Sequence, residues 1–145
     1  MDKRTCYLKG GLPMSGWKRI LPAAVLLAAA LFLLTPSAAR LCFAGRVWAA
    51  GLTAEPGQTD GLDGNGRWVF RDPETLALIA EVILTSEMTD CTDCQFSTWP
   101  EPPYFIGDRE VGGNGCLTCH YLGRFYLFEP GQACRKAFRA VIPPL

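Results

Sequence analysis

The stretch DPETLALIAEVILTSEM, residues 72–88, is the clearest element of the sequence and decides the expected fold. It opens with the signature of a helix N-terminus: Asp72 at the N-cap, Pro73 at the first helical position and Glu74 in the first turn. Apolar residues occupy most of the following positions and leave only a thin polar stripe, as in a buried helix. We therefore predict a helix over residues 73–88 at the centre of the core.

Weaker signals on either side complete the expected domain. A turn at Asn65-Gly66 leads into a short strand over 67–70, and the aromatic stretch 121–128 predicts a second strand before the Glu129-Pro130-Gly131 break. Residues 132–141 predict a short helix with three basic side chains on one solvated face. The expected fold class is a small α+β or irregular, cysteine-stapled single domain over 66–145, preceded by a linker over 40–65 that lacks a sustained period.

The amino-terminal segment is typical of a secretory signal. Lys18 and Arg19 precede an apolar run, residues 20–34, and small residues follow it at 37–39. Such an order predicts a signal peptide or membrane anchor over 1–39, with cleavage after about Ala39 preferred to anchoring. A start at Met14 would give a signal of ordinary proportions, and we expect the rest of the chain to be exported.

The composition limits the possible functions. Lys+Arg 14 balance Asp+Glu 14 among 145 residues, so the charge gives no reason to expect nucleic acid as a partner. The chain has Cys 7, and a domain this small and loop-rich is often stabilised by cross-links or a cofactor. Export to an oxidising compartment favours disulfides or covalently bound haem over zinc.

Four of the cysteines form two Cys-x-x-Cys pairs, Cys91–Cys94 and Cys116–Cys119. The only histidine, His120, directly follows the second pair. Cys116-Leu-Thr-Cys-His120 resembles the haem-attachment motif of c-type cytochromes. The resemblance implies thioethers at Cys116 and Cys119 and an axial iron bond from His120. Met88 is the best sixth ligand that the chain offers, with Cys91 and Cys94 left to form a disulfide.

Two other uses of the cysteines remain open. The spacing of the pairs also resembles a zinc ribbon, with Cys91, Cys94, Cys116 and Cys119 as ligands. Alternatively, the six cysteines after the amino-terminal segment form disulfides, with Cys42 and Cys134 closing a long loop across the domain. Cys6 precedes the expected start at Met14 and is not among them.

The leading functional hypothesis is an exported one-haem electron carrier, periplasmic or anchored facing the periplasm, that meets a redox partner protein in the envelope. The alternative is a disulfide-stapled or zinc-stapled interaction module of the envelope. Both are non-catalytic, and no motif identifies an enzyme. The membrane would be a partner only through an uncleaved amino-terminal segment.

Overall fold

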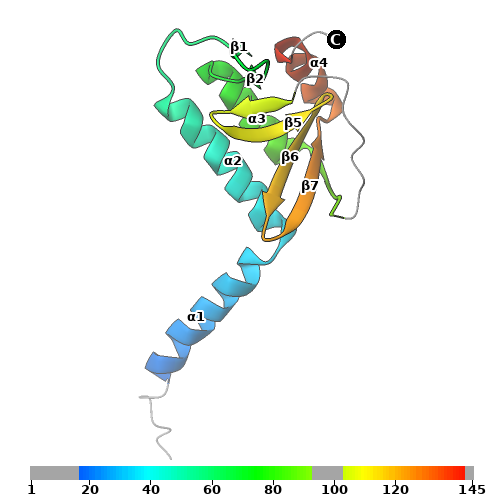
Figure 1. Ribbon diagram of the computed structural model, residues 1–145. Helices are drawn as coiled ribbons and strands as arrows, with labels where there is room; N and C mark the ends of the chain where they lie inside the picture. Colours follow the sequence, from blue (N-terminus) through cyan, green and yellow to red (C-terminus); the bar gives the residue numbers. More distant parts are fainter. Residues whose placement is uncertain (1–16, 93–102, 143–145) are drawn as a thin grey trace, which may run out of the picture. The chain divides into compact units, whose positions relative to one another are not determined.

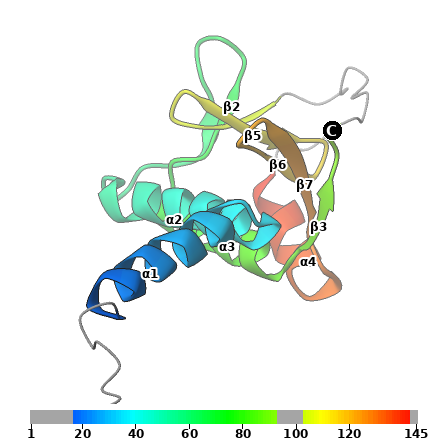
Figure 2. The same cartoon turned by 90° about the horizontal axis from the view of Figure 1, so that it is seen from below.

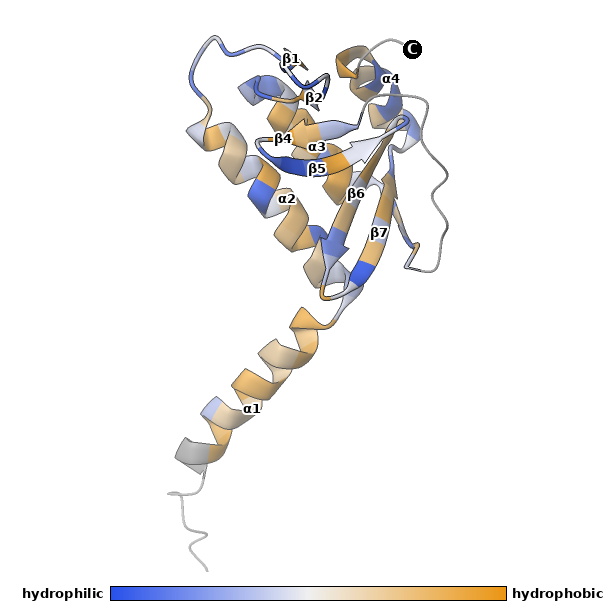
Figure 3. Cartoon of the chain, viewed as in Figure 1, coloured by the Kyte–Doolittle hydropathy of each residue, from blue (hydrophilic) through white to orange (hydrophobic). Residues whose placement is uncertain are grey.

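The computed structural model describes residues 17–92 and 103–142, which divide into two units at Leu34/Thr35. The first unit contains α1 (Trp17–Leu33), which is apolar over most of its length (Figure 3). Its large apolar side chains are exposed, for example Leu26 at 71%. Among the described residues no single helix is long and apolar enough to cross a bilayer, although α1 and α2 taken together reach that length and hydropathy.

The second unit is a small α+β domain (Figure 1). In chain order, its elements are α2 (Pro36–Thr53), β1 (Gly61–Leu62), β2 (Trp68–Val69), α3 (Pro73–Thr85), β3 (Glu87–Asp90), β4 (Tyr104–Ile106), β5 (Arg109–Gly113), β6 (Cys116–Tyr121), β7 (Arg124–Glu129) and α4 (Gln132–Val141). The described strands form a 7-stranded sheet in the order β1-β2-β4-β5-β6-β7-β3. The sheet is mixed, because β2 and β4 run parallel while the other neighbours run antiparallel.

Helices α2, α3 and α4 lie on the same side of the sheet (Figure 2). The core forms between these two layers, which is the usual solution for burying one apolar face of a sheet. Its largest fully buried side chains come from every layer: Phe70, Leu76, Ile79, Ile83, Tyr104, Leu117, Tyr126, Phe128 and Phe138. The expected α+β class is confirmed.

Helix α3 confirms the prediction for residues 73–85. The Asp72 carboxylate accepts a hydrogen bond of 2.9 Å from the Thr75 backbone N–H, and Pro73 occupies the first turn. The predicted extension to Met88 is wrong, because Ser86 is the C-cap: its N–H makes the last helical bond to the Val82 carbonyl, and its ψ of 154° turns the chain into an extended conformation. Met88 therefore lies in β3, paired with Phe128 of β7.

Helix α2 occupies much of the stretch expected to be a linker, so that expectation is wrong for residues 40–53. Thr35 caps the helix and Pro36 begins it. Ala39, Phe43 and Val47 on one face are 0%, 4% and 2% exposed, respectively, and belong to the main core. The remaining faces carry exposed apolar residues such as Leu41, Trp48 and Leu52, so the sequence lacks the alternation of polar and apolar faces that indicates a helix.

Local predictions for the rest of the chain agree with the structure in part. Residues 61–69 form a hairpin whose turn contains Gly66 at φ 73°, and the Asp63 carboxylate accepts from the Asn65 and Arg67 N–H groups at 2.9 and 3.0 Å. Helix α4 spans the expected residues and exposes its basic face. The expected strand over 121–128 begins later, because Leu122 and Gly123 form the turn between β6 and β7.

The hairpins around β6 have two-residue turns. Asn114 and Gly115 have φ of 51° and 75°, and Leu122 and Gly123 have 49° and 76°. Positive φ at both central residues defines the type I′ turn, whose twist matches antiparallel strands. In the β5–β6 turn the Gly115 N–H also donates to the buried Tyr104 hydroxyl at 2.9 Å. Residues 112–115 thus belong to a tight hairpin between β5 and β6.

Gly112 controls where β5 and β6 separate. The β4–β5 register shifts between Tyr104 and Phe105, as at a β-bulge, and Gly112 has φ +151°. A Cβ at Gly112 would lie 2.1 Å from the Cys116 carbonyl oxygen. The β5–β6 ladder consists of only two pairs, Gly113↔Cys116 and Gly112↔Leu117, and ends at Gly112. The β4–β5 hairpin and the β6–β7 hairpin therefore diverge from each other over α2 (Figure 1).

We predict that Gly112→Ala lowers the free energy of unfolding by more than about 2 kcal/mol, because it combines unfavourable φ with a backbone clash. Gly45→Ala is the matched control, since Gly45 is a helical glycine with nothing within 4 Å of an added Cβ. It should raise stability by about 0.5–1 kcal/mol. Urea unfolding measures both, and equal stability of the two variants would contradict this account of Gly112.

Candidate functional site

A cavity of about 520 Å³ lies where the β4–β5 hairpin and β6 separate above α2. Its apolar walls are Phe43, Val47 and Ala50 of α2 together with Ile106 and Val111 from the β4–β5 hairpin. Thr118, Cys119 and His120 supply the β6 wall. This volume falls within the range of small-molecule and peptide-side-chain sites. Sequence reasoning missed the cavity, because only the separation of two hairpins creates it.

Charged side chains surround the apolar part of the cavity. Arg46, Arg109 and Glu110 line it and are exposed overall. The Arg46 side chain donates to the Cys42 carbonyl at 3.3 Å and to the Cys119 sulfur at 3.5 Å, so it is held against the α2–β6 side. Two guanidinium groups and one carboxylate give these three lining residues an excess of positive charge.

The Cys119 thiol lines this cavity. Burial raises the pKa of Cys119, and the neighbouring Arg46 guanidinium offsets that rise only in part. A thiol with a raised pKa is protonated near neutral pH, and the thiolate is the reactive form.

Strand β6 contains all of Cys116, Cys119 and His120. Successive side chains of a strand point to opposite faces, so Cys116 and Cys119, three positions apart, lie on opposite faces of the sheet. Cys119 belongs to the main core, whereas Cys116 lines a separate hollow together with Arg135 and Arg139 of α4. This conformation does not fit two thioether bonds to one porphyrin edge.

The predicted axial ligands are also apart. His120 is exposed and its ring contacts Phe125 of β7 edge-on, with centroids 4.6 Å apart. Met88 pairs with Phe128 on β3, and β7 lies between β3 and β6. Met88 shares a sheet face with its cross-strand neighbours Phe128 and Leu117, whereas His120, three positions from Leu117, lies on the opposite face. The sheet therefore separates the two predicted ligands in this fold.

The other cysteine predictions are not assembled within residues 17–92 and 103–142. No group of three or more His, Cys, Asp or Glu side chains there could hold a metal ion. Cys94, one of the four proposed zinc ligands and the proposed disulfide partner of Cys91, lies outside the described residues. Cys91 is buried at the end of β3, and its N–H bonds to the Phe125 carbonyl at 2.8 Å.

The structure does not join Cys42 and Cys134, which were expected to form a disulfide. Both are free thiols. Cys42 lies near Tyr121, whose pKa is raised by burial and then by the Cys42 thiol. Cys134 lies instead with its sulfur 3.8 Å from the Thr85 hydroxyl. The domain is thus held by its core rather than by this cross-link.

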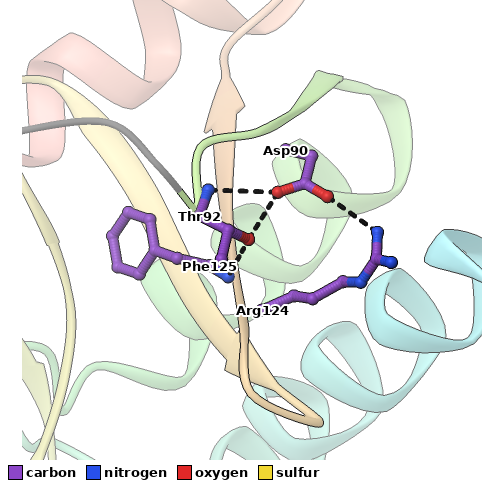
Figure 4. A network of polar contacts seen from close by, with 4 residues as sticks. All are labelled: Asp90, Thr92, Arg124 and Phe125. Atoms are coloured by element: carbon purple, nitrogen blue, oxygen red, sulfur yellow. Dashed lines mark hydrogen bonds and ion pairs between the residues drawn. The ribbon is translucent and has the colours of Figure 1, made fainter.

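A polar network joins the end of β3 to the start of β7 (Figure 4). Thr92 donates to the Asp90 carboxylate from its hydroxyl at 2.6 Å and from its N–H at 3.1 Å, and Arg124 forms an ion pair with Asp90 at 3.0 Å. The Phe125 N–H donates to the Thr92 hydroxyl at 3.1 Å. This network holds Phe125, the ring on which His120 packs.

Comparison of the chain with protein-family models, curated proteins and solved structures finds no match.

The Asp90 network should contribute to the free energy of unfolding only while the Asp90 carboxylate is ionised. Hydrogen bonds from Thr92, and then the Arg124 guanidinium, hold the pKa of Asp90 below its ordinary value. A carboxyl whose pKa is depressed on folding stabilises the fold above its unfolded pKa of about 3.9 and loses that effect as pH falls through the folded value.

We expect Asp90→Asn to be less stable than the wild type at pH 7, with the difference shrinking as the pH falls below about 4. Urea unfolding across this pH range measures the difference. Asp108→Asn, at the exposed tip of the β4–β5 turn, serves as the control. A difference between wild type and Asp90→Asn that stays constant from pH 7 to pH 2.5 would show that Asp90 contributes no charge-dependent stability.

Proposed function

We propose that the protein is a non-catalytic binding module and that the cavity between α2, the β4–β5 hairpin and β6 is its binding site. The observation that carries the proposal is structural: a cavity of about 520 Å³ is built into the backbone by the separation of two hairpins. Because Gly112 is restricted to this geometry, the cavity does not depend on a single side-chain rotamer.

The lining defines the ligand chemistry. The apolar side chains of α2 and the β4–β5 hairpin would bind an apolar group through removal of its surface from water. Arg46 and Arg109 lie on the charged part of the lining, with Glu110 as the one opposing charge among the described lining residues. An apolar ligand with an anionic end satisfies both features.

The proposal includes an exported domain held at the membrane by a retained amino-terminal segment. Ala38 and Ala39, next to the expected cleavage point, are 1% and 0% exposed in the first turn of α2. Cleavage after Ala39 would also remove the Thr35 cap and Pro36 from the domain. Retention of residues 35–39 is therefore favoured by packing, and the basic residues Lys18 and Arg19 at the start of α1 favour an outward-facing domain.

The electron-carrier hypothesis is not carried forward into this proposal, because the β6 conformation does not fit haem attachment. It stays a prediction of the motif alone. Visible spectroscopy and intact mass of the protein, purified from a host that attaches haem c, decide between the two. We expect a colourless protein whose mass includes residues 35–39.

A Soret band that survives denaturation, with the mass of one haem added, would replace the binding module with the electron carrier. A colourless protein whose mass begins at residue 40 would leave the cavity proposal standing and remove the retained anchor.

The ligand chemistry is tested with 4-phenylbutyrate, an apolar acid, and its neutral counterpart 4-phenylbutanol. We predict that the acid shifts backbone amide resonances of Val47, Val111 and Thr118 in NMR titrations. The alcohol should bind about two- to fivefold more weakly, the usual effect of a partly exposed charge pair. Arg109→Ala should reduce this preference for the acid, and Glu110→Gln should increase it.

Ala50→Trp places a bulky side chain in the cavity and should abolish the shifts. Ala49→Trp is the matched control, because Ala49 is its exposed neighbour on α2 and does not line the cavity. Equal binding by the two folded variants, or shifts confined to other parts of the domain, would refute the cavity as the binding site.

A further inference from the structure

The β6 wall of the cavity is an open strand edge. In a two-residue hairpin the residues flanking the turn exchange backbone hydrogen bonds, so Tyr121 and Arg124 form a bonded pair. Bonded and non-bonded pairs then alternate along an antiparallel ladder. Thr118 and His120 consequently direct their backbone N–H and C=O groups away from β7, toward the side where β5 would lie.

Strand β5 does not cover this edge. The turn at Asn114–Gly115 makes Gly113↔Cys116 the bonded pair of the β5–β6 ladder, and the ladder ends at Gly112↔Leu117. The next hydrogen-bonded pair would join Thr118 to Val111 of β5. The register shift in the β4–β5 ladder falls at Val111, however, and β5 no longer pairs with β6 there. Outside the ladders, no hydrogen bond within residues 17–92 and 103–142 involves the N–H of Thr118 or His120, and the His120 carbonyl accepts one from the Cys119 thiol at 3.6 Å.

This open edge coincides with the cavity, which Thr118 and His120 both line. Thr118 is only 6% exposed, so its backbone groups are largely removed from bulk water. Backbone donors and acceptors in such a place favour a partner that supplies matching groups at the spacing of a strand. An apolar surface beside a strand edge is also what a bound peptide needs for its alternate side chains.

We propose that the ligand of the cavity is an extended peptide segment of a partner protein, which adds to the edge of β6 at Thr118 and His120. This inference rests on the proposed binding function and names its ligand class. One set of alternate peptide residues hydrogen-bonds to β6, and side chains on one face of the peptide enter the apolar cavity. An acidic side chain elsewhere on the peptide would be attracted to the exposed Arg46 and Arg109.

The test uses the peptide acetyl-Val-Thr-Val-Glu-Val-Thr-amide and two N-methylated forms, titrated into the full-length protein and followed by NMR. One form carries N-methyl groups on its three Val residues and blocks one peptide edge. The other carries them on the Thr and Glu residues and blocks the opposite edge, because alternate N–H groups of a strand face the same side.

We expect the parent peptide to shift the Thr118 and His120 amides and slow their hydrogen exchange, while the Cys119 amide, already bonded in the β6–β7 ladder, changes least. One N-methylated form should lose at least about tenfold in affinity and the other should bind like the parent. Equal effects of the two forms, or shifts without slowed exchange at Thr118 and His120, would overturn the inference.

The same titrations separate this inference from the proposed function. Binding of 4-phenylbutyrate without binding of the peptide would overturn the peptide inference and leave the apolar binding site intact. Binding of neither compound would remove both.

Discussion

The close approach of Gly112 to the Cys116 carbonyl is the constraint on which the rest of the domain depends. At this position only a residue without a Cβ fits, because the backbone has a positive φ and the carbonyl would lie 2.1 Å from the added atom. The contact lets β5 leave β6 after two paired residues instead of continuing alongside it. The hairpins can therefore separate without breaking the turn that joins them.

Helix α2 converts this separation into a cavity with a rigid wall. Phe43 packs against Phe128 of β7, with ring centroids 5.6 Å apart, while Phe43 and Val47 also line the cavity. The same helical face thus contacts the sheet core at one end and lines the cavity where the hairpins diverge. A cavity lined by side chains that also hold the core together is difficult to close without loss of stability.

The sequence was informative where local chemistry decides the conformation. Asp72 and Pro73 begin α3, and the Asn65-Gly66 turn is where it was expected. It was uninformative for α2, because apolar residues on all its faces hide the helical period and its Gly and Pro residues are typical of a linker. The cavity was beyond local reasoning, since it requires a bulge in β5 and the packing of a helix distant in sequence.

The Cys-x-x-Cys-His pattern shows why a motif needs its backbone conformation. In a helical turn, residues three apart share a face, so two such thiols and an adjacent imidazole can approach one group. In a strand the side-chain period is two, and the same spacing directs Cys116 and Cys119 to opposite faces. His120 also faces away from Cys119 for the same reason. With β6 held between the Gly112 contact and the Leu122–Gly123 turn, the motif cannot gather its side chains without unpairing β6 from β7. In this fold β6 instead presents a backbone edge at Thr118 and His120 that β5 does not pair with, beside an apolar space.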